Sequence, residues 1–242
     1  MKSNPMKHYF KMVALGALIS LVPSLSRAMN IENGETISVL DGARLEFWEW
    51  EPSGFCRLVT DELAKCGIKK NPFGVGLDRV KTAEMLARLD SVIEASPAYA
   101  ILMPMCADYN PWTEPHPSES YTKNLGEIMT KLKAANIKTI IVTSYAQNSN
   151  SEFSPNNNTA DYNEVIRGLA QEHGATLIDL TEILDKAEKP VPLDGSPAAK
   201  ALVNQIFAGE VLRVLGFSDQ EVADCRKAWL DTPGLVMLPP KP

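Results

Sequence analysis

Histidine and cysteine are scarce in this chain of 242 residues, which contains three histidines and four cysteines. The cysteine spacings match no metal-binding motif, and we expect no metal site. No glycine-rich phosphate loop follows the first predicted strand, which argues against a nucleotide, and we expect no cofactor. No internal repeat is present, and 45% of the residues are hydrophobic, enough to bury the core of a single domain.

A long apolar run occurs only near the amino terminus. Three lysines precede the apolar residues 12–22, and Ser26 and Ala28 then provide small side chains where a signal peptidase reads. This run is too short to span a bilayer. We therefore predict a signal peptide at residues 1–28 and a secreted or periplasmic protein, with an uncleaved amino-terminal anchor as the alternative.

Positive charge is also in deficit. Removing residues 1–28 deletes four basic residues and no acidic one, so that twenty basic and thirty acidic residues remain and the net charge falls from -6 to -10. An acidic exported domain is repelled by nucleic acid and by anionic membrane surfaces. We expect a small-molecule or glycan ligand as the partner, and the oligomeric state is left open.

Short apolar runs alternate with segments of helical periodicity along the chain. The runs predict strands at residues 37–40, 99–106, 139–144 and 176–180, with a weaker strand at 69–75. Periodicity and capping residues predict helices at 55–65, from Thr82 to before Pro97, and at 118–136, 162–173, 181–187, 196–215 and 218–229. This alternation predicts an α/β fold with right-handed crossovers. We expect a three-layer α/β/α sandwich with a flavodoxin-like five-stranded parallel sheet over residues 29–232, followed by a Pro-rich tail at 233–242.

All four cysteines, Cys56, Cys66, Cys106 and Cys225, lie in the predicted mature part. Export permits disulfides, but four cysteines allow three pairings and the sequence does not choose among them. Cys66 and Cys225 form a plausible pair because each lies near a predicted helix end. Cys106, after the central strand, is alternatively a small buried hydrophobic residue.

Four different motifs follow one another along the predicted domain. They are Gly54-Phe55-Cys56-Arg57-Leu58-Val59; Gly74-Val75-Gly76-Leu77-Asp78-Arg79 followed by Met85-Leu86-Ala87-Arg88-Leu89-Asp90; Met105-Cys106-Ala107-Asp108; and Leu193-Asp194-Gly195-Ser196-Pro197. Together they resemble the first, second, third and fifth blocks of the SGNH (GDSL) hydrolase family, especially its exported bacterial esterase-like members. The resemblance covers roughly residues 37–216. It implies the same sandwich fold and an ester hydrolase ancestry.

The resemblance also identifies the positions of the family's catalytic residues, and most of them have changed. Ala43 stands where the family has its serine nucleophile, Ala107 where it has an oxyanion asparagine, and Pro197 where it has the histidine base. Gly76 matches an oxyanion glycine, and Asp194 is the one triad-type residue retained. One missing oxyanion donor costs about 10²–10³ in rate, and loss of nucleophile or base removes most of the triad's contribution. We predict a pseudoenzyme or carbohydrate-binding relative of the esterases.

The alternative is an active hydrolase that removes O-acyl groups from glycans with unconventional residues. Asp41, Asp108 and Asp194 each follow or approach a strand end in the family layout. At one edge they would bind a cation or act as an acid–base pair, whereas as structural remnants they would cap local turns. His116, on the loop after the central strand, is either a catalytic base or an ordinary surface histidine.

Aromatic residues near the same edge favour retained ligand binding. Trp48, Tyr109 and Trp112 are suited to stack on sugar rings, with Asn110 beside them, unless they pack the loops over the sheet. We therefore expect a ligand site lined by these four residues together with Asp41, Gly76, Asp108 and His116.

Overall fold

The computed structural model describes residues 30–41, 54–68, 72–77, 80–104, 108, 116–145, 159–187 and 196–231. The predicted signal peptide and the Pro-rich tail lie outside these ranges. Among the described helices, none combines the length and the hydropathy needed to cross a membrane.

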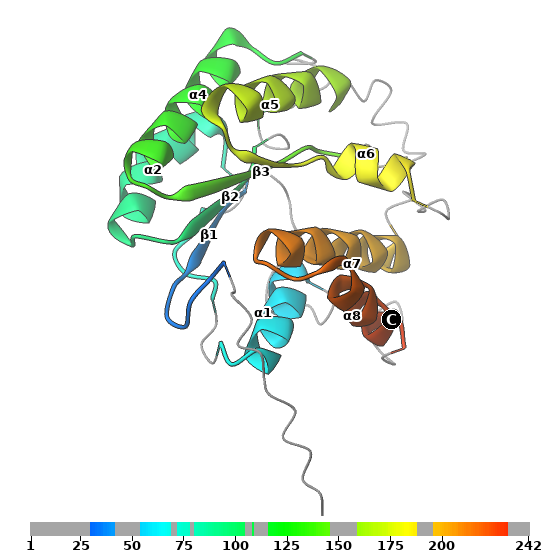
Figure 1. Cartoon of the computed structure of the whole chain (residues 1–242). Coiled ribbons are helices and arrows are strands. Elements are labelled where there is room, and N and C mark those ends of the chain that lie inside the picture. Colours follow the sequence, from blue (N-terminus) through cyan, green and yellow to red (C-terminus); the bar gives the residue numbers. More distant parts are fainter. Residues whose placement is uncertain are drawn as a thin grey trace, which may run out of the picture.

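A parallel sheet of four strands, in the order β1-β2-β3-β4, lies at the centre of the fold (Figure 1). Its strands are β1 (Ile37–Asp41), β2 (Tyr99–Met103), β3 (Lys138–Val142) and β4 (Thr176–Ile178). The register pairs Val39 with Ile101 and Ile101 with Ile140. The strands are mostly apolar, and β2 entirely so, because both faces of a parallel sheet are covered by helices.

The weakest predicted strand, at residues 69–75, is not a regular strand in its described part. Residues 72–77 run beside the outer edge of β1 and form isolated bridges that pair Phe73 with Ile37 and Leu77 with Leu40. Two glycines interrupt this segment, and glycine weakens a regular ladder. Among the described residues the sheet therefore has four strands rather than the five predicted, with an irregular segment covering the edge of β1.

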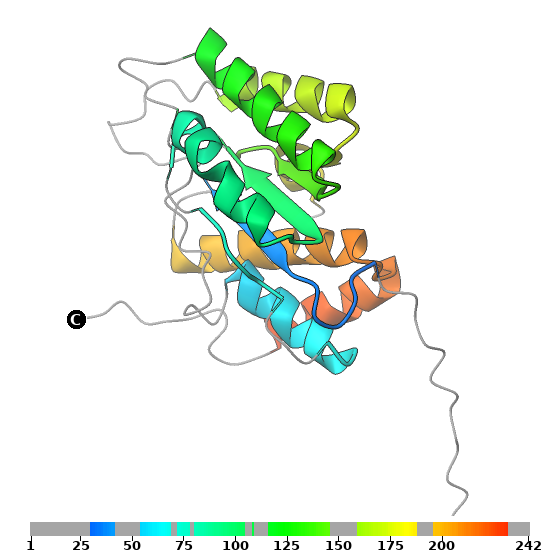
Figure 2. The ribbon, with the colours of Figure 1, turned by 90° about the vertical axis from the view of Figure 1, so that its left-hand side faces the viewer.

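Helices cover both faces of the sheet (Figures 1 and 2). One layer consists of α2 (Thr82–Glu94), α4 (Glu119–Ala134) and α5 (Thr159–His173), and the other of α1 (Phe55–Lys65), α7 (Pro197–Val214) and α8 (Asp219–Leu230). The short α6 (Leu180–Asp185) follows β4.

Two hydrophobic cores separate the three layers. Val39 and Ile101 belong to the core under α1, α7 and α8, while Leu40 and Leu102 belong to the core under α2, α4 and α5. Successive side chains of a strand point to opposite faces, which explains this division. The predicted three-layer α/β/α sandwich is confirmed.

Serine residues define the beginnings of three helices. Ser118, Ser196 and Ser218 are the N-caps of α4, α7 and α8, and each side chain accepts a hydrogen bond from the backbone N–H three residues later. Thr82, at which the second predicted helix starts, does not cap it: Lys81 is the N-cap of α2 and Thr82 is the first helical residue. The Thr82 hydroxyl instead contacts a distant carboxylate.

Candidate functional site

The first predicted acid, Asp41, is the last residue of β1 and is only 1% exposed. Its backbone N–H donates to the carbonyl of Leu77 at 2.7 Å, and its carbonyl accepts from the N–H of Val80 at 3.2 Å. The irregular edge segment therefore holds Asp41 in place at the carboxyl end of the strand. Ala43 and Trp48, which follow it, lie outside the described residues.

Asp108 caps a helix that lies far from it in sequence. Its Oδ2 accepts from the backbone N–H of Thr82 at 2.8 Å, and its Oδ1 accepts from the Thr82 hydroxyl at 2.9 Å. Asp108 is 8% exposed and Thr82 is fully buried. A carboxylate at this position also suits the positive end of the α2 dipole. These contacts use both oxygens of Asp108 to hold the start of α2.

Gly76 lies too close to β1 for any larger residue. A Cβ atom at this position would be 2.6 Å from the carbonyl oxygen of Val39. The next residue, Leu77, donates its N–H to the same carbonyl at 2.9 Å. The glycine is therefore needed for the close approach of this segment to β1, whatever else its backbone does.

His116 connects the start of α4 to the first turn of α5. Its Nδ1 lies 2.6 Å from Oδ2 of Asp161, and its carbonyl accepts from the hydroxyl of Tyr162 at 3.2 Å. The His116 side chain is 65% exposed. An imidazole paired with a carboxylate has the arrangement of a general base and its orienting partner, but this pair lies on the surface.

The last of the four motifs, residues 193–197, ends at the start of α7. Ser196 accepts a hydrogen bond from the N–H of Ala199 at 3.2 Å, and Pro197 is the first helical residue. Proline suits this position because its fixed φ matches the helix and its missing N–H would have had no helical partner. Like Ala43 and Trp48, five more predicted site residues lie outside the described residues: Ala107, Tyr109, Asn110, Trp112 and Asp194.

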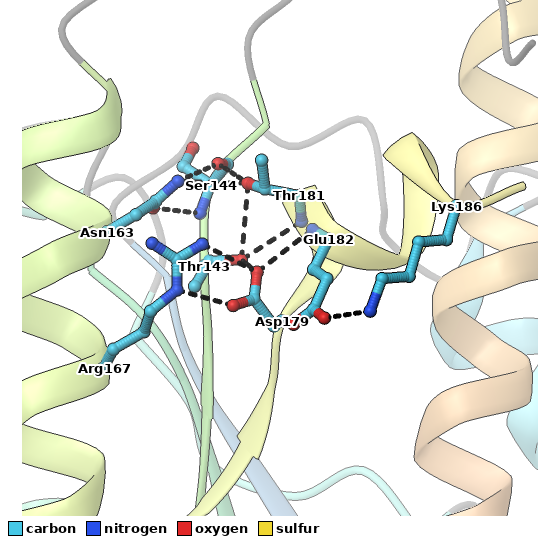
Figure 3. A network of polar contacts seen from close by, with 8 residues as sticks. All are labelled: Thr143, Ser144, Asn163, Arg167, Asp179, Thr181, Glu182 and Lys186. Carbon is cyan, nitrogen blue, oxygen red and sulfur yellow. Dashed lines mark hydrogen bonds and ion pairs between the residues drawn. The ribbon is translucent and has the colours of Figure 1, made fainter.

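A polar network that sequence reasoning missed lies where β3 and β4 end (Figure 3). Arg167 of α5 forms a double hydrogen bond with Asp179, through Nε to Oδ2 at 2.6 Å and Nη2 to Oδ1 at 3.1 Å. The hydroxyl of Thr143 donates to the same Oδ1 at 3.0 Å. Thr143 and Asp179 each directly follow a strand, which is the sequence signal that marks this network.

The second half of the network is centred on Asn163, which is 1% exposed. Its side chain accepts from the N–H of Ser144 at 2.9 Å and donates to the carbonyl of Ser144 at 2.7 Å. The hydroxyl of Thr181 donates to the same carbonyl at 2.7 Å. The ends of β3, α5 and α6 are thereby tied together, and the backbone at Ser144 is held on both sides (Figure 3).

Charge within the network favours an ionised Asp179. Burial raises the pKa of this carboxyl, but the hydrogen bonds from Arg167, from the N–H of Glu182 and from Thr143 outweigh burial and lower the pKa below its ordinary value. The Arg167 pKa is raised, chiefly by its hydrogen bond to Asp179. This carboxylate is a fixed anion of the scaffold and a poor candidate for general acid.

In the described ranges, no group of three His, Cys, Asp or Glu residues is placed to hold a metal ion.

Comparison with solved structures shows similarity to esterases of this architecture. An acetylxylan esterase from Geobacillus stearothermophilus superposes with a TM-score of 0.58 at 18% identity, covering 78% of this chain and 98% of that one. An alpha/beta hydrolase enzyme from the metagenome of Lake Arreo, Spain, gives 0.57 at 18% identity with the same coverage. The acetyl xylan esterase AlAXEase gives 0.54 at 18% identity, covering 75% of this chain and 99% of that one. At these identities the similarity shows the fold.

Comparison of sequences shows the family. No curated protein sequence matches the chain. Residues 38–199, which are more than half of the chain, match the GDSL-like Lipase/Acylhydrolase family. The predicted SGNH (GDSL) resemblance is therefore confirmed, and the protein belongs to the GDSL-like lipase/acylhydrolase family.

Proposed function

We propose that this family member is exported, no longer hydrolyses esters by the serine mechanism, and binds a glycan or related neutral ligand at the carboxyl edge of its sheet. The observation that carries the proposal is the start of α7. Ser196 caps this helix and Pro197 begins it, so the position of the family's histidine base is occupied by a residue that serves helix initiation.

Two of the other acid–base candidates, Asp108 and His116, have structural contacts of their own. Both oxygens of Asp108 hold the start of α2, and His116 lies on the surface in contact with Asp161. The serine mechanism then lacks three groups. Ala43 replaces its nucleophile, Ala107 replaces one oxyanion donor, and Pro197 replaces its base.

The ligand class follows from charge and from the residues at the edge. The predicted mature chain carries thirty acidic and twenty basic residues, which disfavours anionic ligands. Three aromatic residues in this part of the sequence, Trp48, Tyr109 and Trp112, are of the type that stacks on sugar rings. Two of the similar structures are named as acetylxylan esterases, which supports a glycan.

A second candidate function is hydrolysis of O-acyl groups from glycans with non-standard residues. The observation that favours it is the 2.6 Å contact between His116 Nδ1 and Asp161 Oδ2, the geometry of a base with its orienting carboxylate. Of the acids in the predicted site, Asp41 and Asp194 remain for such a mechanism, because both oxygens of Asp108 hold the start of α2.

The decisive assay compares the mature chain with a restored triad. The wild type is expected to release no more acetate than buffer from an aryl acetate or from acetylated xylo-oligosaccharides. The combined substitutions Ala43→Ser, Ala107→Asn and Pro197→His should raise turnover at least about 10²-fold. Ala43→Ser alone, which supplies a nucleophile without a base, is the matched control and should stay at background.

Binding is measured separately by titrating xylo-oligosaccharides and following tryptophan fluorescence. Trp48→Ala and Trp112→Ala should each weaken binding, while Trp229→Phe, at a buried tryptophan on α8, should not. Wild-type turnover that disappears in His116→Ala would establish the hydrolase alternative. Absence of both turnover and binding would refute the proposal.

A further inference from the structure

Helices α1, α7 and α8 form one layer, and their directions follow from the connections between them (Figure 1). The N–H of Asn30 donates to the carbonyl of Leu215, at the end of α7, at 3.1 Å. The carbonyl of Asn30 accepts from the hydroxyl of Tyr99, at the start of β2, at 3.0 Å. Helix α7 therefore ends at the amino edge of the sheet, as does α1, which follows β1 and runs back along it.

Only residues 215–218 separate the end of α7 from the start of α8. A connection this short places consecutive helices antiparallel. Because α1 and α7 run in the same direction, α8 is antiparallel to α1 as well.

A buried carboxylate sets the level at which α1 and α8 meet. Glu62 of α1 is 5% exposed, and its Oε1 accepts from the indole Nε1 of Trp229 of α8 at 3.2 Å. The ammonium of Lys65 donates to the same oxygen at 2.7 Å. The contact between residues 62 and 229 is therefore a fixed point between the two helices.

Cys66 and Cys225 each lie about one helical turn from the contact between Glu62 and Trp229. Because the two helices are antiparallel, this places the two cysteines opposite each other. Cys66 comes four residues after Glu62, and Cys225 comes four residues before Trp229. In antiparallel helices a step of four residues forward in α1 matches a step of four residues back in α8, a rise of about 6 Å in each case. Burial, a hydrogen bond with Glu62 and the charge of this carboxylate raise the pKa of the Cys225 thiol to about 12.

We propose that Cys66 and Cys225, both thiols in this structure, form a disulfide bond that joins the end of α1 to α8 in the exported protein. Cys66 is exposed and open to an oxidant, whereas Cys225 is buried. This inference rests on the proposed function in one respect, the export of the protein, because disulfides persist in oxidising compartments. It does not depend on ligand binding or on the absence of turnover.

The oxidant is a small-molecule or protein disulfide. The Cys66 thiolate attacks one sulfur of that disulfide, forms a mixed disulfide and displaces the other sulfur as a thiolate. Cys225 then loses its proton to water and attacks the Cys66 sulfur, which releases the second sulfur of the oxidant. Two protein thiols are oxidised to one disulfide, and the oxidant disulfide is reduced to two thiols.

The test uses the purified mature chain equilibrated with oxidised glutathione, blocked with an alkylating reagent and digested without reduction. Mass spectrometry should find a cross-linked peptide pair that contains Cys66 and Cys225 and separates on reduction. Reduction should lower the Tm of the wild type by roughly 5–10 °C, because the bond closes a loop that spans most of the domain.

The substitution Cys66→Ser should abolish both the cross-linked pair and the Tm difference between oxidised and reduced protein. The matched control is Cys56→Ser, in the same helix but 2% exposed in the core, which should keep both even if it lowers stability. Recovery of Cys66 and Cys225 as alkylated thiols, or their pairing with Cys56 or Cys106, would overturn the proposal. The cross-linked pair in the wild type decides the question even if a variant fails to fold.

Discussion

Asp108 and Thr82 are joined by two hydrogen bonds of 2.8 and 2.9 Å although 26 residues separate them in the chain. One bond satisfies a backbone N–H at the start of α2, and the other satisfies a buried hydroxyl. A residue that the family resemblance marks as part of a catalytic block thus has a defined structural role here.

The first prediction is that Asp108→Ala lowers the free energy of unfolding by about 2–3 kcal/mol, because it leaves a buried N–H and a buried hydroxyl without their acceptor. Urea denaturation measures the change. Thr82→Val removes only the hydroxyl and should cost less, and the double variant should cost less than the sum of the two single changes. Additive costs would show that the two side chains are not coupled.

The second prediction concerns acid stability. The folded-state pKa of Asp179 lies below its ordinary value of 3.8, so its ionisation favours the folded state. This contribution is present above the unfolded-state pKa and is lost as the pH falls through the folded-state pKa. Asp179→Asn should therefore lower stability at neutral pH and flatten the fall in stability below about pH 4.

Thermal unfolding measured from pH 7 to pH 2 tests this dependence. Asp90→Asn is the matched control, because Asp90 is 80% exposed and meets Lys131 at 3.7 Å. Exposed pairs of this kind contribute roughly 0–1 kcal/mol, so this variant should keep the wild-type pH profile. An Asp179→Asn variant with an unchanged profile would contradict the role assigned to the network.

The third prediction is that Gly76→Ala destabilises the protein by about 1–3 kcal/mol, because the new methyl group would lie 2.6 Å from the Val39 carbonyl. Differential scanning calorimetry provides the measurement. In Gly168→Ala, on helix α5, the new Cβ meets nothing within 4 Å, so that variant should gain about 0.5–1 kcal/mol. Equal and small effects of both variants would show that residues 72–77 move away from β1 at little cost.

The fourth prediction compares two buried asparagines. Among the residues that the structure describes, Oδ1 of Asn204 is buried without a hydrogen-bond partner, whereas Asn163 is bonded on both sides of its amide. Asn204→Leu should raise the free energy of unfolding by about 0.5–2 kcal/mol, and Asn163→Leu should lower it by about 2–4 kcal/mol. Guanidinium denaturation gives both values, and a loss on Asn204→Leu would point to an ordered water bound by this amide.

Local pattern alone predicts much of this fold. Short, mostly apolar runs identify the four strands, because a strand between two helical layers buries side chains on both faces. Ser118, Ser196 and Ser218 mark helix starts because a serine side chain satisfies an N–H only three residues away. The family resemblance likewise depends on short motifs that the sequence displays directly.

The long-range side-chain contacts, in the candidate site and between α1 and α8, depend instead on tertiary structure. Asp108 with Thr82, His116 with Asp161, and Glu62 with Trp229 are separated by 26, 45 and 167 residues. No local propensity encodes such pairs, because they form only when the sheet and its helices bring distant segments together. The described part of the predicted strand at 69–75 departs from a regular strand for the same reason, since Phe73 and the following Leu77 pair with β1 at isolated bridges. Alternation of apolar and helical segments thus determines the sandwich, and packing between its layers determines which side chains meet.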